Sequence, residues 1–565
     1  MLVGMTHIRD TLKGLLLDAV DSAGYEVCDF TLEHPTDMSH GDYAANVALI
    51  LAKQAGESPR DVAEKIVANV KADDTVSNIE VAGPGFINIT LSREYLKNSV
   101  KDAVRVGEAW GTNTVYENER VIVEYTDPNP FKELHIGHLV PNALGESLAC
   151  LMEASGAEVR RVTFQGDVGM HVAKAMYGLS ALGLSKDSPL SAQDLGRAYA
   201  KGASLFEDVE HAEKIKALNK AIYERTDADI VSLYDKGKAV SLSYFDEAYK
   251  ILGTTFDHFF FESVTGPEGR DIVRAHIGDV FEESDGAVIY RGEKVGLHTR
   301  VFINAEGLPT YESKDLGLMK CKFDWWPFTR SITVTGMEQK EYFKVVSKAA
   351  GEVIPELAGK VELVPNGMLR LSEGKMSSRT GNVLPALDLI RTVKEKILER
   401  MSDADIENKE VIAQDVAVGA IKFAILRSGS GKDIIFDFEK SISFEGDSGP
   451  YLQYTHARLV SVLEKAESVG VRASADTVPE TPYMIERMLY HFPEVVTRAT
   501  VEREPHFVVT YLIELAGAFN AFYAHERIAD ATDTYAPYKM LLAHAVLLTL
   551  KRGLWVLGIK APQKM

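Results

Sequence analysis

The chain has 565 residues, of which 46% are hydrophobic and 25% charged, and its formal net charge is −20. This length is too great for one core, and a prior of about 100–200 residues per domain predicts roughly three to five units. The sequence contains no apolar run of about eighteen residues and no basic-then-apolar leader, so it predicts neither a membrane span nor a signal peptide and favours the cytoplasm.

Cysteine usage and charge restrict the function further. Cys28, Cys150 and Cys321 are far apart and form no C-x-x-C pair, which argues against a disulfide framework and a structural zinc. We therefore expect no metal ligands among the site residues. The negative net charge does not exclude a polyanionic partner such as RNA, but it confines the binding of that partner to a local basic strip.

Residues 1–115 are predicted to form a separate α/β unit. An amphipathic helix opens it, and further helices are expected over Asn46–Lys53 and after Ser58, where Pro59 suits the first helical turn. Ile79–Leu91 is predicted to form a strand, a tight turn and a second strand.

Residues 116–385 contain repeated βα units. The β-branched run at Val121–Tyr125 and the strand Val159–Phe164 each precede a helical pattern, which predicts a doubly wound parallel sheet of the Rossmann type with ligands at the carboxyl ends of its strands. A mostly helical segment at about 185–285 is interpreted as an insertion. The sheet is then expected to resume with three strands, Val288–Tyr290, Val301–Ile303 and Ile332–Thr335.

Beyond residue 385 the pattern is almost entirely helical. Residues 386–440 are expected to be a connecting region and 441–565 an all-α bundle. The stretches Ser402–Glu410 and Glu467–Thr481 have the composition of connections.

The most informative segment follows the strand Val121–Tyr125. His135 and His138 lie three residues apart at the start of a helix, where backbone N–H groups favour negative charge, and their side chains are expected to donate to phosphate oxygens. Gly137 between them allows close approach of the backbone to a nucleotide. Taken alone, two histidines at a helix start are more often caps or solvated side chains.

A second motif, Glu373–Asn382, favours a functional role for the two histidines over a role as caps. It reads Glu-Gly-Lys-Met-Ser-Ser-Arg-Thr-Gly-Asn and alone would be interpreted as a solvated basic turn. Together the two segments resemble the HIGH and KMSKS signatures of class I aminoacyl-tRNA synthetases. The family implies use of ATP with Mg²⁺ as a substrate complex.

Other segments resemble the arginyl-tRNA synthetases within that class. These are Gly41-Asp42-Tyr43, Gly83–Asn88, Phe444–Arg458 and Leu557–Met565. The resemblance implies that residues 1–115 contact the elbow of tRNA(Arg), that 386–440 contact its stem and that 441–565 bind its anticodon. It also suggests a monomer. Candidate tRNA contacts, chosen for stacking and edge recognition of unpaired bases, are Phe86, Asn88, Tyr451, Gln453 and Tyr454.

A guanidinium offers five donors and a permanent charge, so a selective pocket needs carboxylates and carbonyl oxygens in fixed places. By resemblance, Glu124 and Asn129 are expected to hold the amino-acid end of arginine, while Tyr311, Asp315 and Gln339 are expected to bind or orient its guanidinium. Tyr311 and Asp315 share one face if a helix begins there. The remaining site residues implied by the resemblance are catalytic His135, His138, Lys375 and Arg379, and nucleotide-binding Gly137, Gly166, Asp167, Met376, Ser377 and Ser378.

The sequence departs from the family pattern at two positions. Ser378 stands where KMSKS has its second lysine, followed by Arg379, and His171 stands where the family has glutamine after Gly166-Asp167. The division of labour between Lys375 and Arg379, and the contact of His171 with the nucleotide, are left open.

Two alternatives remain. One is another class I synthetase, of which the cysteinyl and glutamyl enzymes are nearest in size, although the cysteinyl enzymes need zinc-ligand cysteines that this chain lacks. The other is a synthetase-like paralogue that binds tRNA without charging it. Retention of His135, His138, Lys375 and Asp315 argues against the paralogue.

Overall fold

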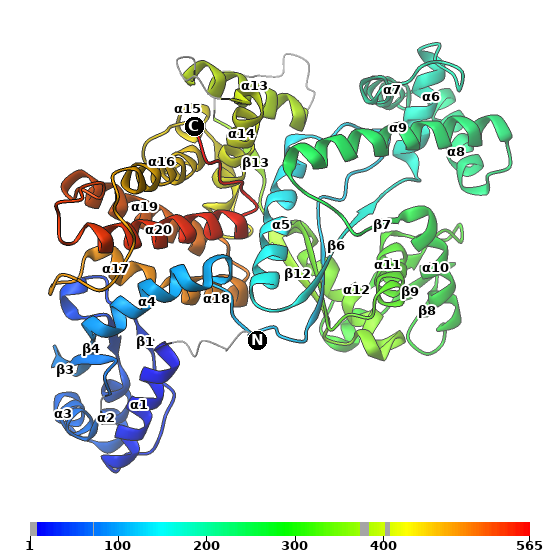
Figure 1. Cartoon of the computed structure of the whole chain (residues 1–565). Coiled ribbons are helices and arrows are strands. Elements are labelled where there is room, and N and C mark those ends of the chain that lie inside the picture. The colour runs from blue at the N-terminus through cyan, green and yellow to red at the C-terminus, as the bar shows by residue number, and fades with distance from the viewer. Residues whose placement is uncertain (1–7, 72, 373–383, 402–406) are drawn as a thin grey trace.

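The computed structural model describes residues 8–71, 73–372, 384–401 and 407–565 (Figure 1). A parallel-sheet domain, an N-terminal α/β unit and a C-terminal helical bundle make up the chain, which confirms the predicted fold class. Lys375, Met376, Ser377, Ser378 and Arg379 of the second motif lie outside the described residues.

Five parallel strands form the central sheet, in the order β12-β11-β5-β6-β7. The chain starts in the middle at β5, runs outward through β6 and β7, and returns on the other side through β11 and β12, which is a doubly wound sheet with its switch point between β5 and β11. The middle strand is buried on both faces, and Val121, Ile122 and Val123 are fully buried. The strands are β5 Arg120–Glu124, β6 Glu158–Gln165, β7 His258–Phe261, β11 Arg330–Gly336 and β12 Val361–Asn366.

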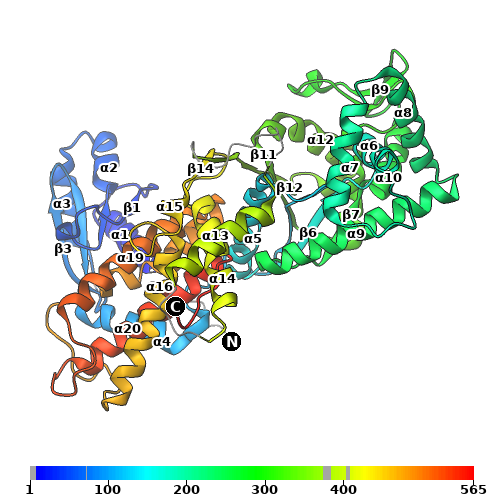
Figure 2. The same cartoon turned by 90° about the horizontal axis from the view of Figure 1, so that it is seen from above.

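Helices cover the sheet and fill the connections between its strands (Figures 1 and 2). Helix α5 (Leu139–Ala154) follows β5 and is buried along almost its whole length, because it lies between the sheet and the C-terminal bundle. Further short helices are η3 Ile136–His138, η4 Gly292–Val295, η5 Met337–Gln339 and η6 Pro355–Leu357, and the longer ones are α6 Met170–Ala181, α10 Glu262–Ala275, α11 Tyr311–Trp325 and α12 Lys340–Val353.

The predicted insertion at about 185–285 is too long. Its helical part consists of α7 Ala192–Leu205, α8 Val209–Glu224 and α9 Ala228–Leu252, whereas β7 pairs in parallel with β6 and belongs to the central sheet. Helix α7 packs so closely on α6 that a Cβ on Gly202 would lie 1.8 Å from the carbonyl oxygen of Lys174.

The prediction that the central sheet resumes at Val288–Tyr290 and Val301–Ile303 is wrong. These residues lie in β9 (Ala287–Tyr290) and β10 (Arg300–Ile303), which form a separate antiparallel sheet with β8 (Glu282–Ser284). Only the third predicted strand, Ile332–Thr335, lies in the central sheet, as part of β11.

The N-terminal unit has its own core around a four-stranded antiparallel sheet of order β1-β2-β4-β3. The predicted strand, turn and strand are β3 and β4, and the Ser58 side chain caps the helix that begins at Pro59. The elements are α1 Ile8–Ser22, β1 Leu32–Glu33, η1 Met38–His40, β2 Tyr43–Ala45, α2 Val47–Ala55, α3 Pro59–Asn69, β3 Val76–Ala82, β4 Phe86–Leu91, α4 Arg93–Val106 and η2 Gly107–Ala109.

The described C-terminal part is helical apart from β14, which pairs in parallel with β13. Helix α19 alone among the described helices is long and apolar enough to cross a membrane, but it packs in the bundle core through Leu512, Leu515 and Phe519. The elements are β13 Leu369–Leu371, α13 Ala386–Arg400, α14 Lys409–Leu426, β14 Ile434–Phe436, α15 Phe438–Ser441, α16 Gly449–Ser468, α17 Met484–Leu489, α18 Phe492–Glu502, α19 His506–His525 and α20 Ala536–Val556.

The N-terminal unit packs on the bundle, which lies between that unit and the central sheet in the view of Figure 2. Arg93 of α4 forms an ion pair of 2.6 Å with the fully buried Glu486 of α17. Asp42 lies 3.4 Å from Arg487. These contacts fix the N-terminal unit to the bundle.

Candidate active site

The loop between β5 and α5 has an unusual backbone. Thr126, Asp127 and Phe131 adopt positive φ angles of 78°, 44° and 66°, which side-chain-bearing residues rarely adopt. Such strain is maintained only where the surrounding structure fixes it, and it often occurs at functional sites. Tyr125 provides one such restraint, because its buried ring packs against Gly145 of α5, where a Cβ would lie 2.2 Å from the ring.

His135 and His138 lie side by side at the end of this loop, with ring centroids 3.8 Å apart. The backbone N–H of Gly137 donates to Nδ1 of His135, and the backbone N–H of His135 donates to Nδ1 of His138, each at 3.1 Å. An imidazole that accepts at Nδ1 carries its proton on Nε2. Both rings are therefore held as donors at Nε2.

The two rings are neutral near pH 7. Burial lowers the pKa of His138 to about 3, with a smaller contribution from neighbouring His135. Burial also lowers the pKa of His135, and Lys132 acts in the same direction. The pair can thus offer hydrogen bonds to a phosphate group but no positive charge of its own.

The chain leaving the second motif lies directly beside this loop. The N–H of Ile136 donates to the carbonyl of Leu384 at 3.0 Å, and the N–H of Ala386 donates to the carbonyl of Leu134 at 2.7 Å. His135 also forms a β-bridge with Pro385. The segment that follows the second motif is thereby joined to the segment that contains the histidines.

A pocket of about 220 Å³ opens at the switch point of the sheet, between the carboxyl ends of β5 and β11. Of the predicted arginine contacts, Glu124, Asp315 and Gln339 line it. Helix α11 begins at Tyr311, so Tyr311 and Asp315 share a helical face as predicted, but the Tyr311 side chain is 69% exposed and lies outside the lining.

Asn129 lies beside the pocket and not in its lining. Its Oδ1 is so near Gly166 that a Cβ on that glycine would come within 2.3 Å of it. The loops after β5 and β6 therefore contact each other at a position that requires glycine.

The pocket contains several buried charges. Lys322 of α11 lies 2.6 Å from Oε2 of Glu124, and both side chains are almost completely buried. Asp315 accepts a hydrogen bond of 2.7 Å from the hydroxyl of Tyr342. Burial raises the pKa of Asp315 to about 7, despite the opposing effect of that hydrogen bond.

Asp127 is a further carboxylate in the lining. Its Oδ1 accepts the backbone N–H of Phe164 at 2.7 Å and lies 3.3 Å from the hydroxyl of Thr163. Burial raises its pKa well above the usual range, and the charge of Glu124 adds to that rise.

Asp167, a predicted nucleotide contact, is saturated by protein donors in this structure. Its carboxylate accepts from Tyr234, Lys238 and both the N–H and the hydroxyl of Ser263. His171 makes a 2.7 Å contact from Nε2 to the carbonyl of Gly166. Both side chains thus shape the loop after β6.

The candidate tRNA contacts differ in accessibility. Phe86 is 39% exposed, while Tyr451 and Tyr454 are half-buried. Asn88 and Gln453 are buried, and Gln453 donates to the backbone carbonyls of Asp415 and Lys560, so in this structure these two side chains support the fold and are not presented to a ligand.

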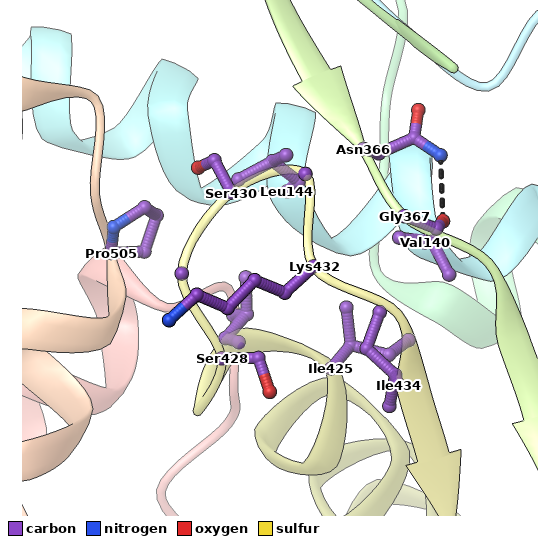
Figure 3. A pocket seen from close by; sticks show the side chains of 13 residues that line it. Val140, Leu144, Asn366, Gly367, Ile425, Ser428, Ser430, Lys432, Ile434 and Pro505 are labelled. Carbon is purple, nitrogen blue, oxygen red and sulfur yellow. Dashed lines mark hydrogen bonds between the residues drawn. The ribbon is translucent and has the colours of Figure 1, made fainter. Parts of the chain in front are cut away.

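A second cavity lies where the loop Ser428–Lys432 meets the end of β12 and the N-terminus of α19 (Figure 3). Leu144 and Ile434 contribute apolar walls, and the Lys432 side chain extends across the opening. Its volume of about 20 Å³ admits a water molecule but no amino acid or nucleotide. The switch-point pocket is therefore the better substrate site.

The sequence interpretation missed Asp127, Lys322, Thr333 and Tyr342, which all line the switch-point pocket. A signal existed for Lys322, because it follows Asp315 by seven residues and so lies on the same helical face. The strand positions gave a weaker signal for Thr333, which pairs in register with Glu124.

Comparison with known proteins agrees with this arrangement. The family model described as "tRNA synthetases class I (R), catalytic domain" matches residues 100–438, and "Arginyl tRNA synthetase N terminal domain" matches residues 6–91. "DALR anticodon binding domain" matches residues 452–565. The chain belongs to the class I arginyl-tRNA synthetase family.

Individual relatives within the arginyl-tRNA synthetase family match over most of their length. An arginine–tRNA ligase of Borrelia hermsii is 31% identical over 86% of this chain and 86% of that protein. One of Treponema denticola is 29% identical over 97% of this chain and 98% of that protein. The arginyl-tRNA synthetase structure from Thermus thermophilus, 24% identical, has a TM-score of 0.81 over 99% of this chain and all of that chain, and shows the same fold.

Proposed function

We propose that the chain is an arginine–tRNA ligase that activates L-arginine with MgATP and transfers the arginyl group to the 3′-terminal adenosine of tRNA(Arg). The observation that carries this proposal is the acidic switch-point pocket beside two histidines held as Nε2–H donors. Membership of the arginyl family agrees with it. No observation favours the paralogue or another class I synthetase.

Recognition of arginine is assigned to the pocket and its rim. Asp315, with Gln339 and Tyr311, receives the guanidinium, because a buried carboxylate oriented by Tyr342 matches its fixed fork of donors. Glu124 and Asn129 hold the amino-acid end. A competitor without the guanidinium leaves buried acceptors unpaired, which is worth roughly 10⁴-fold or more in comparable polar pockets.

In the first step an oxygen of the arginine carboxylate attacks the α-phosphorus of ATP, and the bond to the bridging oxygen breaks to release pyrophosphate. No protein nucleophile is needed, so the protein acts by positioning both substrates and by placing donors where charge develops. His135 and His138 supply such donors. Lys375 and Arg379 of the second motif, with Met376, Ser377 and Ser378, are assigned to the nucleotide phosphates.

In the second step the terminal ribose hydroxyl of tRNA attacks the carbonyl carbon of arginyl-adenylate, and AMP leaves. Gly137, Gly166 and Asp167 are assigned to the nucleotide in both steps, and Gly166 lies against Asn129. The first step is proposed to require bound tRNA.

The parts of the chain are assigned to parts of the tRNA. Residues 1–115 contact the elbow, 386–440 the stem and 441–565 the anticodon. Phe86, Tyr451 and Tyr454 are the accessible candidates for base contacts, while Asn88 and Gln453 would need a rearrangement to reach a base. A cytoplasmic monomer completes the proposal.

ATP–pyrophosphate exchange with each amino acid, run with and without tRNA(Arg), tests the proposal. We expect exchange with arginine alone among the amino acids, and only when tRNA is present. Exchange driven by a different amino acid would refute the arginine assignment. If the chain showed neither exchange nor charging with cognate tRNA, the non-charging paralogue would be favoured.

A further inference from the structure

The chain that leaves helix α20 lies against helix α5 of the catalytic domain. The carbonyl oxygen of Val556 accepts from the hydroxyl of Ser147 in α5, and that of Gly558 accepts from Nζ of Lys422 in α14, each at 2.7 Å. Both donors are buried, with exposed fractions of 0% and 1%. We call residues 556–562 the C-terminal strap.

The other end of the strap is held by the bundle. The carbonyl of Lys560 accepts from Nε2 of Gln453 at 2.8 Å, and the carbonyl of Pro562 accepts from Nδ1 of His456 at 2.9 Å. Both donors lie in α16 and are buried. A buried donor that loses its acceptor is costly, so alternate carbonyls along the strap fix its position between α5 and α16.

Gly558 brings the strap into contact with Glu146 of α5. Its φ of 65° and its place just after α20 are typical of the glycine that ends a helix. A Cβ on Gly558 would lie 3.0 Å from Cγ of Glu146 and 3.2 Å from Nζ of Lys422. A cavity of about 440 Å³ borders both Glu146 and Gly558. The Glu146 side chain therefore has open space on one side and depends on the strap on the other.

Glu146 connects this contact to the loop that carries the two histidines. Its Oε2 accepts from the hydroxyl of Tyr125 at 2.7 Å, and its Oε1 accepts from Nε of Arg161 at 3.1 Å. Tyr125 is fully buried and directly precedes Thr126 and Asp127, where the backbone is strained. A shift of the Glu146 carboxylate therefore moves the residue at which the strained loop begins.

We propose that Glu146 is a positioning residue for arginine activation, which passes the position of the C-terminal strap through Tyr125 to His135 and His138. It touches no substrate and forms no covalent bond in the reaction. The inference rests on the proposed function and adds to it a direct contact between the end of α20 and the ATP half of the site. It predicts that a displaced strap lowers kcat and leaves arginine binding nearly unchanged.

The test displaces the strap at Gly558. In Gly558→Ala the new methyl group presses on Glu146, and we expect kcat for ATP–pyrophosphate exchange by the full chain with tRNA(Arg) to fall about tenfold, with the KM for arginine within about threefold. Gly183→Ala is the matched control. Gly183 follows α6 as Gly558 follows α20, with a φ of 72°, but the described residues leave open space around it. Both variants place alanine in the left-handed region, so a difference in kcat reports the contact with Glu146.

Tyr125→Phe separates transmission through Tyr125 from a general loss of packing. It removes the hydroxyl that Glu146 accepts and keeps the ring that packs on Gly145. We expect it to lower kcat about tenfold, and we expect Gly558→Ala to lower kcat by less than about twofold further in this background. Losses that multiply to about a hundredfold would overturn the inference, because the strap and Tyr125 would then act independently.

Ser147→Ala is a milder second variant, which frees the carbonyl of Val556 from α5. We expect it to lower kcat about threefold, again without further loss in the Tyr125→Phe background. Urea denaturation shows that each variant is folded. A kcat equal to that of Gly183→Ala in both strap variants, or a change in KM alone, would overturn the inference. If the unchanged chain gave no exchange with arginine, the proposed function would fail; if it did and the strap variants reacted equally well, only the present inference would fail.

Discussion

The Nδ1 atom of His138 accepts the backbone N–H of His135 at 3.1 Å, so the backbone itself decides which nitrogen of the ring carries the proton. A solvated histidine would exchange between both tautomers and would be partly charged near neutral pH. Here the ring is neutral and fixed, and its Nε2–H is the only donor it can offer.

We predict that His138→Asn lowers kcat by about 10²–10³-fold and changes the KM for arginine by less than about threefold. The asparagine oxygen can still accept the N–H of His135, but the shorter side chain does not reach the position of Nε2. Steady-state exchange kinetics measure both constants. His138→Ala, which also removes the acceptor, should lose the same activity and some stability; a large rise in KM with unchanged kcat would contradict the assignment.

Arginine binding should depend on pH through Asp315. Its pKa in the free chain is raised to about 7, and the guanidinium binds the ionised form, so protons compete with arginine as the pH falls below 7. The KM for arginine is therefore expected to rise toward about tenfold per pH unit on the acid side.

Asp315→Asn isolates the contribution of this group. The variant should bind arginine about 10²–10³-fold more weakly and should lose much of the acid-side dependence. Measurements from pH 5.5 to about 8.5 cover the relevant range. An unchanged pH profile in the variant would assign the titration to another group.

The buried pair of Glu124 and Lys322 should show strong coupling in stability. Lys322→Met leaves a buried carboxylate without its partner and is expected to cost about 3–5 kcal/mol in the free energy of unfolding. Adding Glu124→Gln removes the unpaired charge and should restore a large part of that loss. Urea denaturation of the single and double variants measures the coupling, and simple additivity would show that the two groups do not interact.

Close packing of α5 on the strained loop gives a steric prediction. In Gly145→Ala the new methyl group would lie 2.2 Å from the Tyr125 ring, so the ring must move and the unfolding free energy should fall by about 1–3 kcal/mol. Because Tyr125 precedes the loop that carries both histidines, kcat should fall as well. Gly14→Ala, in α1 with open space around it, should be neutral or slightly stabilising, and equal behaviour of the two variants would contradict the packing argument.

The local pattern of apolar and turn residues was sufficient to predict much of the fold. Alternation and turn residues located β3 and β4, and the β-branched run before His135 located β5, whose position at the centre of the sheet the structure shows. The apolar segment His258–Phe261 was missed as a strand, because it is short and follows three helices. The strands at Val288 and Val301 have the same local pattern as sheet strands, and only tertiary pairing assigns them to a separate sheet.

The site was predictable where side chains follow a strand end or a motif, as at Glu124, Asp315 and Gln339. Lys322 was missed although its spacing from Asp315 placed it on the same helical face, because a lysine in a helix usually faces water and its burial depends on the contact with Glu124. Gln453 shows the opposite error: its amide group suits base recognition, but the side chain is fully buried and its Nε2 donates to two backbone carbonyls. Burial of a polar group depends on what packs around it, which local sequence does not specify.

The most direct test of the account measures charging of tRNA(Arg) with L-arginine by the full chain and by Asp315→Asn, each in the presence of all other amino acids. The account predicts that the unchanged chain attaches arginine alone and that the variant loses this activity by about 10²-fold or more. Attachment of a different amino acid by the unchanged chain, or equal arginine charging by the variant, would contradict it.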